Sequence, residues 1–144
     1  MRNCPILMAL CFHGKHMKYL LDTCAFLWFM EDSSVLSAAA RKAIIDPTNE
    51  VYLSAVSGWE IGRKYARGDL QLPKRPEVLL PEMRERTNIL SLPLSELEAI
   101  SAEKLPLIHK DPFDRMLISQ AMLNGMTLVT SDEVFGEYTV PLLW

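Results

Sequence analysis

The sequence has few of the residues that build several common kinds of functional site. Its three cysteines, Cys4, Cys11 and Cys24, form neither an even set nor a CxxC pair. This count favours neither a disulfide framework nor a cysteine-rich zinc site, and it leads us to expect a reduced, cytoplasmic protein. No stretch approaches the roughly 20 consecutive apolar residues of a membrane span, so we expect no membrane segment.

A strong net charge is also absent. The formal net charge is −3, and 49% of the residues are hydrophobic against 23% charged. These values exclude disorder as the main state and do not indicate a general nucleic-acid binder. The charge is unevenly distributed, however, because residues 63–86 carry seven bases and four acids, whereas residues 87–144 carry three bases and eight acids. Such asymmetry suits a single domain with one basic surface and one acidic site.

The first sixteen residues differ from the rest of the chain. An apolar run from Ile6 to Phe12 follows Arg2 and has a weak likeness to a signal peptide, but it is short, and Leu10 is a poor residue before a cleavage site. Met17 then opens the first predicted strand. We therefore expect residues 1–16 to be an N-terminal extension, with Met17 as a candidate for the natural start, and residues 17–144 to form one domain.

Short apolar runs, which predict buried strands, alternate with segments that predict helices. Several helices carry end signals, among them Ser95 with Glu98 as a capping box, Asp111 and Pro112 at a helix start, and Gly125 at a helix end. We expect strands at 19–21, 51–53, 89–91, 127–130 and 139–140, and helices at 25–30, 37–45, 76–86, 95–103 and 111–125, with a further helix starting at Ser54. Unbroken apolar strands joined by helices predict an α/β fold, with a parallel sheet covered on both faces.

Three aspartates stand where such a sheet would bind a ligand. Ligands bind beyond the carboxyl ends of parallel strands, and Asp22 and Asp132 follow two of the predicted strands. Asp114 lies in the first turn of a predicted helix, in line with the apolar residues Leu117 and Ile118 that face the core. Each acid alone is more simply explained as a turn or cap residue, and it is their combination that indicates a site.

A fourth acid, Glu60, begins a polar helical face that continues with Arg63, Lys64 and Arg67. The simple interpretation is a solvated face. The alternative is a metal ligand with phosphate-binding cations beside it. Four converging carboxylates would repel one another unless a hard cation such as Mg²⁺ or Mn²⁺ joined them, and a polyanionic substrate would need nearby bases, for which Arg115 is a further candidate.

Four segments resemble the motifs of PIN-domain ribonucleases: LLDT at 20–23, WEI at 59–61, HKDPFDRMLI at 109–118 and TSDEVF at 130–135. The likeness is greatest to the VapC-type toxins of bacterial toxin–antitoxin pairs. It spans residues 17–144 with the motifs in the expected order, and HKDPFDRMLI is the most specific of them.

The resemblance implies a three-layer α/β/α fold around a mostly parallel sheet of four to five strands. It implies a metal-dependent endoribonuclease, the toxin of a type II toxin–antitoxin pair, which hydrolyses RNA phosphodiesters with one or two Mg²⁺ or Mn²⁺ ions. It also implies a homodimer and inhibition by a small cognate antitoxin. The acidic ligands map to Asp22, Glu60, Asp114 and Asp132, with the hydroxyls of Thr23 and Thr130 as supporting groups and Ser131 as a weaker candidate. For the RNA-binding cations we expect the bases near these acids, Arg63, Lys64, Arg67 and Arg115.

The sequence departs from the family pattern at Cys24, where histidine is common in this subgroup. His109 matches a family histidine, but we assign it a structural role beside the helix rather than a catalytic one. Trp59 and Phe113 are predicted to lie in the core.

Three other interpretations compete with a toxin. A phosphoacceptor signalling domain would need an acidic pair after the first strand and a late lysine, whereas Asp22 stands alone and no lysine follows Lys110. A non-catalytic interaction domain of the same fold is disfavoured by the complete set of acids. A PIN nuclease of RNA maturation, acting without an antitoxin, remains open.

Overall fold

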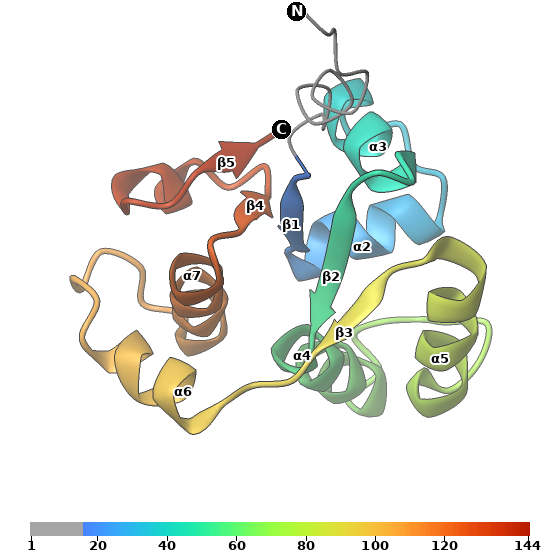
Figure 1. Ribbon diagram of the computed structural model, residues 1–144. Helices are drawn as coiled ribbons and strands as arrows, with labels where there is room; N and C mark the ends of the chain where they lie inside the picture. Colours follow the sequence, from blue (N-terminus) through green and yellow to red (C-terminus); the bar gives the residue numbers. More distant parts are fainter. Residues whose placement is uncertain (1–15) are drawn as a thin grey trace, which may run out of the picture.

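The computed structural model describes residues 16–144 (Figure 1). The first fifteen residues of the predicted N-terminal extension lie outside the described residues. Within the described part, the strands are β1 (Lys18–Leu21), β2 (Glu50–Ser54), β3 (Leu90–Leu92), β4 (Thr127–Val129) and β5 (Leu142–Leu143). The helices are α2 (Thr23–Met30), α3 (Ala38–Ile45), α4 (Ala55–Ala66), α5 (Pro76–Thr87), α6 (Glu96–Glu103) and α7 (Pro112–Asn124), and a 3-10 helix η1 covers Glu133–Glu137.

The five strands form one sheet in the order β3-β2-β1-β4-β5, and every neighbouring pair is parallel. At the carboxyl end of β1, Leu21 pairs with Leu53 of β2 on one side and Val129 of β4 on the other. The strand β1 is therefore the centre of the sheet, with β2 and β3 on one side and β4 and β5 on the other. The predicted α/β fold with a sheet of four to five strands is confirmed.

Two separate hydrophobic clusters show that the sheet is covered on both faces. Side chains alternate between faces along a strand, and Leu20 accordingly packs in one cluster with residues of α7, while Leu21 packs in the other with residues of α2, α3 and α4. Figure 1 shows α6 and α7 on one side of β1 and β2, and α3 and α5 on the other. This is the predicted three-layer α/β/α arrangement.

The local signals for helix ends behave as the sequence predicts. Ser54 ends β2 and caps α4 by accepting a hydrogen bond from the Val56 amide, and Ser95 forms the capping box of α6 with Glu98. Gly125 ends α7 with a φ of 62°, a left-handed conformation that glycine adopts without steric cost. Among the described residues, no helix is both long and apolar enough to cross a membrane.

The prediction for the last strand was wrong. Thr139 and Val140 lie outside any strand, and the last strand pairs Leu142 and Leu143 with β4. The physical reason is that the side chains of Tyr138 and Val140 are buried in the hydrophobic core beside α7. Pairing with β4 therefore begins only at Pro141, whose carbonyl accepts a hydrogen bond from the Leu128 amide. The other predicted strands and helices lie within one or two residues of the bounds given for them, whereas η1 was not predicted.

Candidate metal centre

A pocket of about 140 Å³ lies at the carboxyl ends of β1 and β4, between the starts of α2, α7 and η1. The side chains that line it are mostly acidic. They are Asp22, Thr23, Cys24, Glu60, Asp111, Asp114, Ser131, Asp132 and Phe135. The structure thus places all four predicted acidic ligands, which come from four different parts of the chain, in one pocket.

Asp22 and Asp132 are fixed in this pocket by the helices that they cap. The Ala25 amide donates to Asp22 Oδ1 over 2.7 Å at the start of α2, and the Val134 amide donates to Asp132 Oδ1 over 3.0 Å at the start of η1. In each case one carboxylate oxygen serves the cap, and the capping that we considered as an alternative to a site coexists with the site position. Burial raises the pKa of Asp22, while hydrogen bonds from Thr130 and Ala25 oppose that rise.

Asp114 lies in the first turn of α7 with 23% of its side chain exposed. Burial raises its pKa to about 7, the neighbouring charge of Asp111 adds to the rise, and His109 opposes it. The ionised form of this carboxyl group is only partly compensated, because desolvation and a nearby like charge disfavour it more than His109 favours it. A bound cation would supply the missing compensation.

Glu60 enters the pocket from α4 with both carboxylate oxygens occupied. The Thr23 hydroxyl donates to Oε2 over 2.7 Å, and the Lys64 ammonium lies 2.8 Å from Oε1. Among the bases of this helical face, Glu60 thus pairs with Lys64, one turn further along the helix. This ion pair also raises the pKa of Lys64.

The predicted supporting hydroxyls have different positions. Thr23 is buried and donates its hydroxyl hydrogen bond to Glu60. Thr130 is buried, and its hydroxyl accepts a hydrogen bond from the Asp132 amide over 3.1 Å. Ser131 lines the pocket and is exposed. Thr23 and Thr130 therefore hold acids of the pocket in place.

His109 is the main residue of the site that the sequence interpretation missed. Its Nε2 lies 3.0 Å from Asp114 Oδ2 and 3.4 Å from Asp132 Oδ2, so it touches two of the predicted ligands. Among the described residues, His109, Asp114 and Asp132 form a group whose possible ligand atoms all lie within 4.8 Å of one another. The position of His109 five residues before Asp114, in the most specific motif, was the available signal.

Asp111 and Cys24 were also not predicted to line the pocket. Asp111 caps α7, as predicted, by accepting from the Phe113 amide over 2.9 Å, but it adds a fifth carboxyl to the lining. Burial and the charge of Asp22 raise the pKa of the Cys24 thiol. For Asp111 the signal was its spacing of three residues from Asp114, which places both on one side of the helix start.

The four predicted RNA-binding cations separate into two groups. Arg63 on α4 and Arg67 at the C-cap of that helix are exposed, and Lys64 is half-buried in its pair with Glu60. Arg115 is 4% exposed and does not line the pocket. Its guanidinium donates to the carbonyls of Ala102, Leu105, Pro106 and His109.

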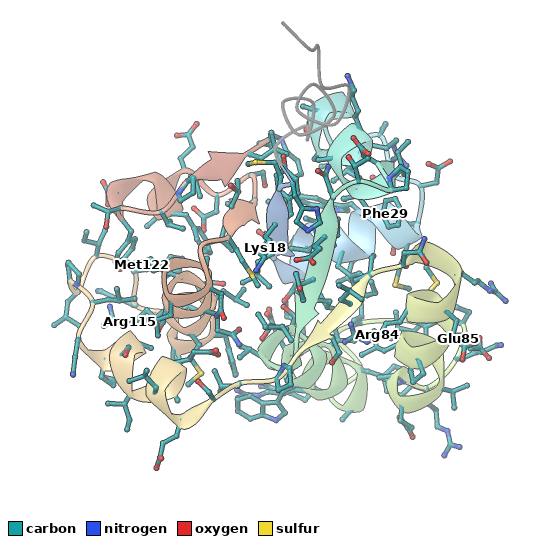
Figure 2. All side chains as sticks on the ribbon, viewed as in Figure 1. Lys18, Phe29, Arg84, Glu85, Arg115 and Met122 are labelled. Carbon is teal, nitrogen blue, oxygen red and sulfur yellow. The ribbon has the colours of Figure 1, made fainter. Side chains whose placement is uncertain are left out.

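This burial gives Arg115 a structural role in place of the predicted RNA contact, because its hydrogen bonds hold the last turn of α6 and the segment between α6 and α7. Figure 2 shows Arg115 beside α7, on the side of that segment. Trp59 also differs from its prediction. It is 60% exposed rather than in the core, and it packs edge-on against the half-buried Phe113 with ring centroids 4.6 Å apart.

The geometry defines an α/β domain with an acidic pocket at the carboxyl end of its sheet. The PIN-domain family model matches residues 19–140, and the chain therefore belongs to the PIN-domain family. This confirms the resemblance on which the site residues were assigned. No curated protein matched the sequence.

Several solved structures share the fold. VapBC2 from Rickettsia felis, bound to a DNA fragment from its promoter, matches with a TM-score of 0.65 and 16% identity over 89% of this chain and 99% of that chain. VapBC-1 from nontypeable Haemophilus influenzae matches with a TM-score of 0.62 and 20% identity over 88% and 97%. FitAcB from Neisseria gonorrhoeae matches with a TM-score of 0.58 and 20% identity over 88% and 96%.

Proposed function

We propose that this protein is a metal-dependent endoribonuclease and the toxin of a type II toxin–antitoxin pair. The observation that carries the proposal is the convergence of Asp22, Glu60, Asp114 and Asp132 in one pocket of a PIN domain. The complexes with which the fold is shared, VapBC and FitAcB, support the assignment to a toxin.

The four carboxylates would hold one or two Mg²⁺ or Mn²⁺ ions. The donor set fits these hard cations, which prefer oxygen ligands. The Asp114 carboxyl, with its pKa raised to about 7, is a group whose ionised form a cation would stabilise. When bound, such an ion supplies positive charge that lowers the pKa of a water molecule and stabilises the oxygens of a phosphodiester under attack.

The residues around the carboxylates would orient them and attract the substrate. Thr23 and Lys64 hold Glu60 through its two oxygens, and this pair of contacts fixes the direction of its carboxylate. Arg63 and Arg67 are exposed on the same helix and would contact RNA phosphates near the pocket. Because the pocket itself is strongly acidic, these cations are needed to offset repulsion of the polyanionic substrate.

An antitoxin would bind at the same surface. A protein segment that carries an arginine could enter the pocket and pair with its carboxylates, since the planar guanidinium matches a carboxylate with two hydrogen bonds. Such a segment would block both the metal ligands and the RNA path. The homodimer implied by the family resemblance stays a prediction, and so does the cytoplasmic location.

The test is cleavage of defined RNA and DNA oligonucleotides by the purified protein with Mg²⁺, with Mn²⁺ or with EDTA. We expect RNA cleavage with either ion and none in EDTA. Asp22→Asn should not cleave, and Glu133→Gln is its matched control, because Glu133 is exposed next to Asp132 but does not line the pocket. Metal-independent cleavage, or no cleavage of any RNA with either ion, would contradict the proposal.

A further inference from the structure

We propose that His109 is a positioning residue that holds Asp114 and Asp132 side by side by donating a hydrogen bond from Nε2, and that it is not a ligand of the metal. The inference rests on the proposed metal site and adds to it a residue for which the family resemblance gave no role in the chemistry.

His109 connects two acids that come from different parts of the chain. Asp114 is on α7, whereas Asp132 follows β4. A single nitrogen, Nε2 of His109, lies 3.0 Å from one carboxylate and 3.4 Å from the other. Two carboxylates that approach the same point repel each other, and a donor placed between them offsets part of that repulsion.

The hydrogen bonding of the other ring nitrogen decides which role Nε2 can have. The Asp111 amide donates to Nδ1 over 3.2 Å. A nitrogen that accepts a hydrogen bond carries no proton, so the neutral ring has its proton on Nε2. That proton points at the two carboxylates. A metal ligand would need the lone pair of Nε2, and the ring could provide it only by moving the proton to Nδ1 and losing the bond from Asp111.

The ring is held in this orientation by its surroundings. The His109 amide donates to the Tyr138 hydroxyl over 2.7 Å, and that hydroxyl donates to the Pro106 carbonyl over 3.0 Å. The ring packs edge-on against Phe135, with centroids 5.5 Å apart, and 15% of the side chain is exposed. A donor fixed before the metal arrives orients the ligands without being one of them.

The buried Arg115 completes this arrangement. It donates to the His109 carbonyl and to three carbonyls of the preceding segment, so one guanidinium fixes the backbone from which the ring projects. The HKDPFDR motif then acquires a physical meaning. Its histidine orients the aspartate five residues later, and its arginine holds the histidine.

The first part of the test needs no metal and no activity. The ¹⁵N chemical shifts of the imidazole ring, measured on the metal-free protein under conditions where the ring is neutral, report which nitrogen carries the proton. We expect the proton on Nε2 of His109. A proton on Nδ1 would overturn the proposal, whatever the protein does with RNA.

The second part compares Mn²⁺ affinity, measured by calorimetric titration, in three variants of the full protein. His109→Gln keeps a donor near the position of Nε2 but is a poor metal ligand, His109→Leu keeps volume without a donor, and His16→Gln changes a remote exposed histidine. We expect His109→Gln to bind Mn²⁺ within about threefold of wild type and His109→Leu to bind on the order of tenfold or more weakly, as is typical when a partner of a metal ligand is lost.

The outcomes separate the two levels of the proposal. Equal losses in His109→Gln and His109→Leu would identify His109 as a ligand, and no loss in either would leave it a purely structural residue; both results overturn the positioning role. A wild-type protein that shows the expected proton position but binds no Mn²⁺ would refute the metal site itself.

Discussion

Replacing Asp114 by asparagine should stabilise the metal-free protein at neutral and alkaline pH. The folded-state pKa of Asp114 is raised from 3.8 to about 7, mainly by burial. A carboxyl with a raised pKa binds its proton more tightly in the folded than in the unfolded state. Stability is therefore highest below the unfolded pKa, falls as the pH rises from about 4 to about 7, and stays low above that range. Asparagine has the same shape and cannot ionise, so it removes this loss.

The size of the effect follows from the same shift. At about 1.4 kcal/mol per pH unit, a rise of the pKa from 3.8 to about 7 corresponds to ~4 kcal/mol. This value is an upper limit because neighbouring charges are coupled to Asp114. We expect the Asp114→Asn protein to have a free energy of unfolding higher than wild type by about 1 to 4 kcal/mol at pH 8 in EDTA, and the difference to vanish near pH 4.

Urea denaturation of both proteins between pH 4 and pH 8 measures this difference directly, because the titrations of all other groups are largely common to the two. Mn²⁺ at 1,000 times its Kd should reverse the order at pH 8, since an ion at that concentration adds about 4.1 kcal/mol to the stability of the protein that binds it. A variant less stable than wild type at pH 8 in EDTA, or a difference independent of pH, would refute the assignment of Asp114 as a carboxyl whose ionised form is disfavoured in the metal-free site.

Three further predictions concern other parts of the molecule. Arg63→Ala combined with Arg67→Ala should weaken RNA binding and flatten its dependence on salt while Mn²⁺ affinity is kept, and an unchanged salt slope would remove this helix face from the RNA path. Arg115→Met should lower the free energy of unfolding by about 2 to 4 kcal/mol, because four carbonyls lose their donor. Arg75→Met, at an exposed position, is the control, and similar effects of the two substitutions in urea denaturation would contradict the structural role of Arg115. Asp22→Asn should abolish RNA cleavage with little loss of stability, and cleavage at the wild-type rate with saturating Mn²⁺ would exclude Asp22 from the site.

The fold was predictable because local and long-range signals agree. Leu20 and Leu21 form part of an apolar run short enough for a buried strand, and the two side chains do pack in opposite layers. Ser95 with Glu98 and Asp111 with Pro112 define helix starts by hydrogen bonds that depend only on neighbouring residues. The convergence of the four acids follows from the rule that parallel strands present their carboxyl ends at one edge of the sheet.

What the sequence could not show depends on contacts between distant segments. The burial of Arg115 requires that carbonyls of residues 102–109 point toward its guanidinium, and the predicted helix pattern does not indicate this. The exposure of Trp59 depends on how α4 packs against α7, which leaves Phe113 in T-shaped contact with its ring and most of that ring exposed. The role of His109 depends on a bond from the Asp111 amide to one particular ring nitrogen.

The last strand shows the same limit on a smaller scale. A β-branched pair at 139–140 resembles a strand in isolation, but Val140 is buried beside α7 and pairing begins only at Pro141. At this edge of the sheet, the burial of Val140 in the core thus decides where strand pairing starts.

The central claim is that the acidic pocket is the metal centre of a ribonuclease, and anomalous X-ray scattering from crystals grown with Mn²⁺ tests it most directly. At Mn²⁺ concentrations that support RNA cleavage, we predict an anomalous peak between the carboxylates of Asp22, Asp114 and Asp132, with His109 beside the ligands but not bound to the ion. Absence of a peak in this pocket while the same protein cleaves RNA, or a peak only at another site, would contradict the account.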